Sequence, residues 1–336
     1  MTARSPDATM PAMPVPAIAI LSILASLPAV ATAADAVVIP PGIVTHGDGR
    51  APIESLFRAS LGLVDKGWTA EVVASSSPSG TTIPLPIIAL RSPKTGPAVW
   101  ILAGIHGEEP AGPNAIAAAI DDIAKLGERR AVVLLPLLNP QGYARNWRYL
   151  NVATYSESVD GQSVGDSSHL LPAAEGPARA RAAAASSPEA GAITAWILAR
   201  QADYPAWLSV DLHEDNLIDE GYVYSQGARG ASDELAKVAV AVLRDHGVPI
   251  KMGGATRFDE PIENGVIGPV TDSSVDELMS AREVVVNGGL RRGPAAESVL
   301  VLETPAAALP LAQRVAAHAA LLQTLAKRLL VSDGGN

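Results

Sequence analysis

The sequence of 336 residues contains no cysteine, and only 18% of its residues are charged. Without cysteine the chain has no disulfide framework and no thiol chemistry, so it must be stable on its core alone. Positive charge is scarce too: 25 Lys and Arg against 35 Asp and Glu leave a net charge of −10. This balance argues against a nucleic-acid partner, because phosphate binding needs a basic face.

Apolar residues are plentiful, and they decide the class of protein. Hydrophobic side chains make up 48% of the chain, which is a globular and not a disordered composition. The length suits one large α/β domain or two small ones, and is ample for a buried core.

The N-terminus has the pattern of an export signal. Arg4 precedes the apolar run "VPAIAILSILASLPAV" (15–30), and the small residues Ala31-Thr32-Ala33 follow it. This pattern predicts a signal peptide at 1–33, a mature chain from Ala34 and a periplasmic or secreted protein that meets the membrane only in transit. The alternative is an uncleaved anchor, although the run is shorter than the ~20 apolar residues that span a bilayer.

Buried strands alternate with helical patterns along the mature chain. Two strands are expected at 69–77 and 83–92, and helices at 112–127 and 309–330. Buried strands are expected at 97–105, where the apolar run is unbroken, and at 130–140, 205–215 and 297–305. The alternation predicts a single domain, 34–336, with a mixed, largely parallel twisted sheet and helices on both faces. Residues 34–55 suggest an extended arm, and 156–195 and 252–274 suggest surface inserts rich in Ser, Gly or Pro.

Each of the four buried strands ends on polar residues that cannot belong to a core. They include His106, Glu108, Glu109, Asn139, Asp211, His213, Glu214, Asp215, Glu303 and Thr304. In an open α/β sheet, ligands bind at the carboxyl ends of the strands, so these side chains point to one site. Two imidazoles and one carboxylate form a catalytic zinc set, and a further carboxylate could take a proton from water.

The same segments resemble the zinc carboxypeptidases of the M14, carboxypeptidase-A-like family. "HGEE" (106–109) is similar to the family's His-x-x-Glu pair, and "NPQGYARNWR" (139–148) to its Asn-Pro-Asp-Gly-Tyr segment with Trp-Arg. "DLHED" (211–215) would supply the later His, and "LVLETP" (300–305) the catalytic Glu. The resemblance implies a carboxypeptidase-like fold and one Zn²⁺ per chain, held by His106, Glu109 and His213. It also implies that Arg148 polarises the scissile carbonyl and that Glu303 is the general base.

The match to the family is incomplete around substrate binding. Where the family has an Asp two residues before an Asn-Arg pair, this chain has "SVDGQSV" or "SVGDSSH", so either Asp160 or Asp166 could support a ligand His. No Arg stands there, and no Tyr occurs between 225 and 303 to replace the family's mobile Tyr. Arg145 and Arg257 are candidate replacements for the anion site, with Asn139 as a further substrate-binding candidate.

The functional expectation is therefore an exported zinc-dependent hydrolase of amide bonds. The resemblance favours a metallocarboxypeptidase or a peptidoglycan stem-peptide peptidase, and a deacylase of N-acyl amino acids of the desuccinylase/aspartoacylase type is the alternative. The substrate is thus a peptide or an acylated amino acid. The sequence names neither the substrate nor the oligomeric state.

Two readings from other classes remain. "GQSVG" (161–165) fits the nucleophile elbow of a serine hydrolase with Ser163, but no buried strand precedes it and no helix pattern follows it. The presence of the three candidate ligands together with Arg148 and Glu303 argues against a non-catalytic binding protein. Glu108 and Glu214 are expected to be solvated neighbours, His318 to be structural, and His46, His169 and His246 to have no role.

Overall fold

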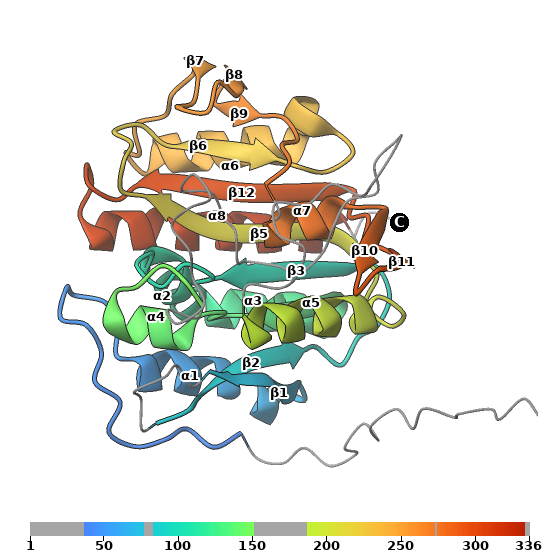
Figure 1. Ribbon diagram of the computed structural model, residues 1–336. Helices are drawn as coiled ribbons and strands as arrows, with labels where there is room; N and C mark the ends of the chain where they lie inside the picture. The colour runs from blue at the N-terminus through green and yellow to red at the C-terminus, as the bar shows by residue number, and fades with distance from the viewer. Residues whose placement is uncertain (1–36, 77–82, 151–186, 273, 333–336) are drawn as a thin grey trace, which may run out of the picture. The chain divides into compact units, whose positions relative to one another are not determined.

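The computed structural model describes residues 37–332 except 77–82, 151–186 and 273. The described residues belong to one compact unit. Its centre is a sheet of ten strands in the order β1-β2-β4-β3-β5-β12-β6-β9-β8-β7 (Figure 1). In that order the strands are Thr69–Ser76, Leu85–Arg91, Ala131–Leu135, Ala98–Ala103, Ala206–Asp215, Ser298–Pro305, Tyr222–Ser225, Val266–Ile267, Pro261–Glu263 and Gly253–Ala255.

The central strands β4, β3, β5 and β12 are mutually parallel. Antiparallel pairs flank them, β2 with β4 on one side and β6 with β12 on the other. The predicted mixed, largely parallel sheet is thereby confirmed. Because the central strands are parallel, the chain leaves β3, β5 and β12 at one common edge. A separate hairpin joins β10 (Glu283–Val286) to β11 (Gly289–Arg292).

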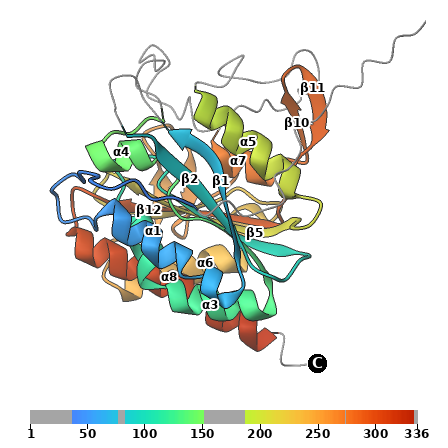
Figure 2. The same ribbon diagram turned by 90° about the horizontal axis from the view of Figure 1, so that it is seen from below.

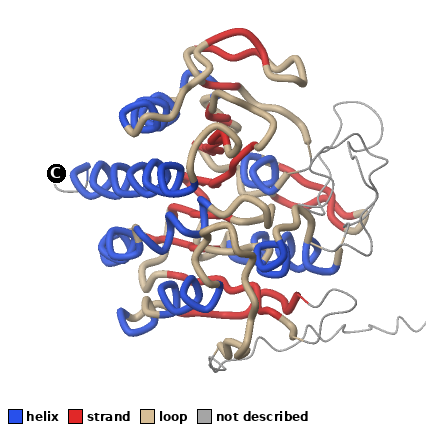
Figure 3. The backbone as a smooth tube through the Cα atoms, turned by 90° about the vertical axis from the view of Figure 1, so that its left-hand side faces the viewer, coloured by secondary structure: helices blue, strands red, loops and turns tan. Residues whose placement is uncertain are grey.

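Helices cover both faces of the sheet, as the apolar runs of the central strands require (Figure 2, Figure 3). One face carries α1 (Ile53–Leu61), α2 (Ala111–Ala118), α3 (Ile120–Arg129), α6 (Glu234–Asp245) and α8 (Leu311–Ser332). The other carries α4 (Pro140–Arg145), α5 (Pro188–Arg200) and α7 (Val275–Ser280). Two short 3₁₀ turns, Val64–Lys66 and Gly230–Ser232, complete the helices. Within the described residues, no helix has both the length and the apolar character to cross a bilayer.

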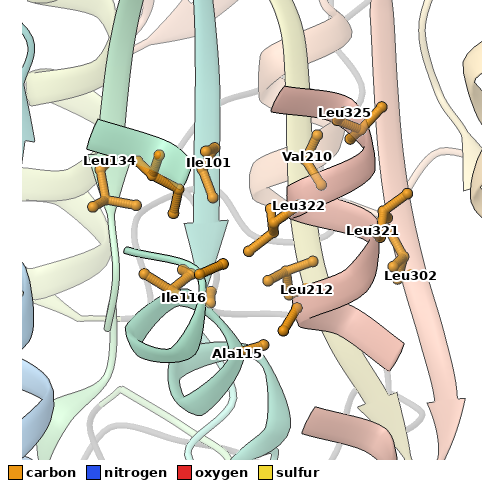
Figure 4. Close-up of a cluster of buried hydrophobic side chains, with 14 of the residues drawn as sticks. Ile101, Ala115, Ile116, Leu134, Val210, Leu212, Leu302, Leu321, Leu322 and Leu325 are labelled. Atoms are coloured by element: carbon orange, nitrogen blue, oxygen red, sulfur yellow. The ribbon is translucent and has the colours of Figure 1, made fainter. Parts of the chain in front are cut away.

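Alternate side chains of each central strand pack in two separate hydrophobic cores, one on each face of the sheet. On β3, Ile101 packs toward α2 and α8, while Trp100 packs on the opposite face with Ile193 and Ile197 of α5. Figure 4 shows the first core, where leucines of α8 lie against strand residues; its labelled members include Ile101, Val210, Leu212, Leu302, Leu321, Leu322 and Leu325. Each such buried side chain contributes roughly 1.5–3 kcal/mol, so the two cores fix the sheet edge firmly.

Four expected boundaries differ from the structure. The arm gives way to α1 at Ile53, and the helix expected at 112–127 is two helices that meet at Ala119. The end of the expected insert 156–195 belongs to α5, whose buried side chains pack on the sheet. The expected insert 252–274 adds β7, β8 and β9 to the sheet. These strands are two or three residues long, too short for a period-two pattern to stand out.

Candidate metal centre

The two predicted ligand histidines and Glu109 meet at the carboxyl edge of the sheet. His106 follows β3, His213 lies near the end of the neighbouring β5, and all three side chains are buried. The Nδ1 atom of His106 lies 2.8 Å from Oε1 of Glu109, and Nδ1 of His213 lies 3.0 Å from Oε2 of Glu109. One ligand atom from each residue lies within 4.8 Å of the others, a geometry that fits a single metal ion.

The charges of the cluster keep Glu109 ionised and, without a metal, favour a proton on His213, which a metal ion would displace because it binds neutral imidazole. Burial alone would raise the pKa of Glu109, but His106 and His213 outweigh burial and hold that pKa well below its usual range. Burial likewise acts to lower the pKa of His213, while the carboxylates of Asp211 and Glu109 raise it well above the usual value. Two imidazoles with one carboxylate are the donor set of catalytic zinc sites, which keep a fourth position open. The residues present therefore fit a zinc ion.

Two charged neighbours orient this donor set. Oδ2 of Asp211 lies 3.4 Å from Nε2 of His213, so Nδ1 of that ring is left to face the cluster. Arg148 places Nη1 2.8 Å from Oε1 of Glu109 and 2.8 Å from Oε1 of Glu108. The sequence offered Asp160 or Asp166 as the supporting carboxylate, and both lie outside the described residues, as does Ser163.

Glu303 stands beside the cluster because of strand register. It pairs with His213 across the parallel β5–β12 ladder. Burial, reinforced by the negative charges of Glu109 and Asp215, raises the pKa of Glu303 to about 8, although His213 and His106 act in the opposite direction. A carboxyl group with its pKa near neutrality is suited to take and return a proton.

The cluster and Glu303 face one cavity of about 570 Å³. The expected insert 252–274 and the start of α7 supply much of its wall. The lining residues are His106, Glu108, Glu109, Arg148, Tyr149, His213, Glu214, Asp215, Asn216, Leu217, Tyr222, Tyr224, Gln226, Arg257, Phe258, Glu260, Val270, Thr271, Asp272, Ser274, Asp276, Val301, Glu303 and Ala306.

The lining residues that sequence reasoning did not single out include Tyr222, Tyr224 and Asp276. The two tyrosines alternate with Val223 in "YVYS" (222–225), and this period-two pattern beside an acidic strand end was the available signal. Burial raises the pKa of both tyrosines, so their hydroxyls stay protonated hydrogen-bond donors. Asp276 gives no such signal, because only the position of α7 brings it to the cavity.

The three predicted substrate-binding residues lie in different places. Arg257 lines the cavity, with Nη1 2.6 Å from Oδ2 of Asp215. Asn139 is fully buried and caps α4, accepting from the amide of Gly142 at 2.8 Å and donating to the carbonyl of Arg148 at 3.0 Å. Arg145, in the last turn of α4, is not part of the cavity wall. The geometry thus brings only Arg257 to the cavity.

Two further expectations concern single residues. Glu214 is not solvated: it is buried and forms an ion pair with Arg314 of α8. The expectation failed because the residue after a strand-end ligand was assumed to face solvent, whereas α8 covers this face. His318 is fully buried, its Nε2 lies 3.0 Å from Oγ1 of Thr304, and burial lowers its pKa to about 3. That environment agrees with a structural role.

Fold and site together define a carboxypeptidase-like α/β protein with a candidate metal centre. Residues 95–160 match the family of the succinylglutamate desuccinylase/aspartoacylase catalytic domain. No curated protein matches the chain in sequence. The match and the fold confirm the resemblance predicted from the sequence.

Solved structures of this class share the fold. A candidate metallopeptidase from Shewanella amazonensis SB2B is similar with a TM-score of 0.62 and 24% identity, over 82% of this chain and 92% of that one. Carboxypeptidase A from Helicoverpa armigera is similar with a TM-score of 0.52 and 14% identity, over 84% of this chain and 73% of that one. A metallo-carboxypeptidase from Burkholderia cenocepacia is similar with a TM-score of 0.51 and 16% identity, over 83% of this chain and 69% of that one.

Proposed function

We propose that the protein is an exported zinc-dependent hydrolase that cleaves amide bonds, as a metallocarboxypeptidase or a peptidoglycan stem-peptide peptidase does. One observation carries the proposal: the buried donors of His106, Glu109 and His213 converge within 4.8 Å on a cavity that also holds the carboxyl of Glu303. A merely structural metal site would be closed by a fourth protein ligand and would need no cavity.

The residues around the cluster divide the chemistry of hydrolysis among them. Zinc, when bound, polarises a carbonyl and lowers the pKa of water. Glu303 takes the proton of the attacking water and passes it to the leaving amine. Arg148 donates to the oxygen on which negative charge develops, exchanging its bond to Glu108 for one to substrate. The protonated hydroxyl of Tyr222 offers a further donor, while that of Tyr224 donates to Oε2 of Glu260 at 2.9 Å.

The charge of the cavity favours a peptide over a doubly anionic acyl substrate. Among the described lining residues, the only Arg or Lys side chains are those of Arg148 and Arg257, and carboxylates pair with both. The carboxylates of Glu260 and Asp272 add negative charge to the same wall. An acidic acyl group would meet repulsion there, whereas the amine of a peptide would meet attraction.

A second candidate function is deacylation of N-acyl amino acids. The match of residues 95–160 to the desuccinylase/aspartoacylase catalytic domain favours it. Both candidates use the same metal donors and the same base, so they differ only in substrate. Competing the two substrate classes on one preparation therefore separates them.

The test uses the purified mature protein. It should carry about one zinc per chain, and a chelator should abolish hydrolysis of a panel of peptides, stem peptides and N-acyl amino acids until zinc is restored. His213→Ala should lose both zinc and activity, while His246→Ala, at the end of α6, should keep both. Full zinc occupancy in His213→Ala would overturn the ligand assignment. Labelling of Ser163 by a fluorophosphonate, with hydrolysis insensitive to chelator, would establish the serine hydrolase instead.

A further inference from the structure

A buried ion pair lies directly behind the metal-binding cluster. Glu214 follows His213 on β5, and successive side chains of a strand point to opposite faces. The carboxylate of Glu214 therefore turns from the cluster toward α8, where it pairs with the guanidinium of Arg314. The side chain of Glu214 has no exposed surface and that of Arg314 is 9% exposed, so water does not screen the pair.

Glu214 joins the two chain segments that carry the ligands. Its Oε2 accepts a hydrogen bond of 2.6 Å from the backbone amide of Ala111, at the start of α2 and two residues beyond Glu109. Its own backbone amide donates to Oε2 of Glu109 at 3.1 Å. Glu214 thus contacts the segment after β3 twice, once through its side chain and once through its main chain.

Arg314 connects the carboxylate of Glu214 to helix α8. Its Nε donates to the carbonyl of Leu309 at 3.0 Å, which holds the guanidinium at the start of α8. The apolar side of α8 packs on α2 and on the central strands. The carboxylate between Ala111 and Arg314 is therefore held by two donors from two helices, and its position is fixed.

An ion pair this deeply buried is a poor source of stability. Desolvating both charges costs about as much as their attraction returns, and apolar side chains of similar size would often serve stability better. The contacts of the pair point to a role in geometry, because it lies between the segment that carries Glu109 and the segment that carries His213. Groups that support metal ligands from behind in this way commonly tune metal affinity.

We propose that Glu214 is a positioning residue of the metal centre, holding Glu109 and His213 at their mutual spacing with Arg314 as its anchor. This proposal rests on the proposed zinc site, although it concerns affinity and geometry and leaves the substrate open. Glu214 contacts neither substrate nor metal in this role. It acts only through the two segments that it joins.

The test compares two neutralised ion pairs. In Glu214→Gln/Arg314→Gln, both charges are removed together, so that neither is left buried alone. Glu71→Gln/Arg200→Gln is the matched control, because this pair also joins two elements, β1 and α5, at 2.7 Å but lies away from the cluster. Zinc affinity of the metal-free proteins is measured by competition with a chromophoric chelator, and thermal midpoints are recorded in parallel.

The Glu214/Arg314 variant should bind zinc ~10–100-fold more weakly than the parent. The control should bind zinc as tightly as the parent, whatever its loss in thermal midpoint. Unchanged affinity in the Glu214/Arg314 variant, or an equal loss in the control, overturns the positioning role.

A conservative substitution guards against a variant that does not fold. Glu214→Asp keeps the buried charge but is too short to reach Ala111 and Arg314 together, so it should fold and still lose zinc affinity. Parent-like affinity in Glu214→Asp would also overturn the proposal. If the parent itself binds no zinc, the proposed function fails; if the parent binds and these variants bind equally well, only the role of Glu214 fails.

Discussion

Two carboxyls of the cavity, those of Glu303 and Asp276, have pKa values raised to about 8. Burial is the main cause for both, and for Asp276 the charge of Asp272 adds to it. Each group therefore holds a proton near neutral pH until a positive charge arrives beside it. A metal ion or a substrate amine in the cavity would release those protons, so binding and protonation are coupled at this site.

Glu303→Gln tests the role of the base. Glutamine keeps the shape and a hydrogen-bonding group but cannot accept the proton, and general base catalysis is typically worth ~10²–10⁴-fold in rate. Turnover should fall by that order, while zinc content, measured by metal analysis, should equal that of the parent. Loss of zinc would instead make Glu303 a fourth ligand. Survival of both zinc and turnover would move the search for the base to Glu108.

Asp276→Asn tests the pH dependence of stability in the metal-free protein. The groups that face Asp276 are Asp272, Asp211, His213, Ser274 and Gln226. The pKa of Asp276 is about 8 in the folded chain against an ordinary value of 3.8, so between those pH values the folded chain keeps a proton that the unfolded chain releases. The protonated carboxyl of Asp276 therefore contributes its full stabilisation of the folded chain at the acidic end of this pH range, and that contribution is lost as pH rises through about 8.

Asparagine has no proton to lose, so the variant should lose less stability than the parent between pH 5 and pH 8. Thermal midpoints at the two pH values measure this, and the difference between the proteins should be at least roughly 2 °C. Asp121→Asn is the control, because that carboxylate is exposed and pairs with Lys66. A parent and an Asp276→Asn protein with the same pH slope would show that Asp276 does not titrate in this window.

At the scale of elements, the segment before α1 braces the turn that carries the ligands. The side chain of Arg50 has no exposed surface and donates to the carbonyls of Gly107, at 2.9 Å, and Tyr143, at 2.6 Å. Its Nη2 donates to Oδ1 of Asn146 at 2.6 Å. One guanidinium thus links this segment to the turn between His106 and Glu109 and to the helix that leads to Arg148.

Arg50→Lys should loosen that turn, because an ammonium group cannot reproduce the planar fork of a guanidinium. Buried carbonyls left without a donor cost about 1–3 kcal/mol each, so the thermal midpoint should fall and zinc should dissociate faster into a chelator. Arg58→Lys, at an exposed position on α1, should change neither quantity. Identical behaviour of the two variants would show that the segment does not brace the turn.

The elements that the sequence predicted are those with long, uninterrupted apolar signals. β3, β5 and β12 were found because strands buried on both faces are mostly apolar, and His106, His213 and Glu303 because each lies near the carboxyl end of such a strand. The wall of the cavity gave no comparable signal. β7, β8 and β9 are short, and residues such as Asp276 and Arg50 acquire their role only from contacts between distant segments.

At the scale of the whole molecule, two cores fix the sheet from both sides and leave its carboxyl edge to the cavity. The ligands come from neighbouring parallel strands, and the base comes from the next strand along, so their spacing follows from the sheet itself.

We expect the protein to be exported, and processing at the N-terminus tests this. The apolar run of 15–30 and the small residues at 31 and 33 are what a signal peptidase recognises. N-terminal sequencing of exported protein should therefore start at Ala34. Ala33→Leu places a large side chain where a small one is needed and should leave the precursor uncut, whereas Thr32→Leu, at the tolerant middle position, should be processed like the parent. An intact Met1 form of the parent in the membrane fraction would instead make the segment an anchor, holding the candidate metal centre at the membrane surface.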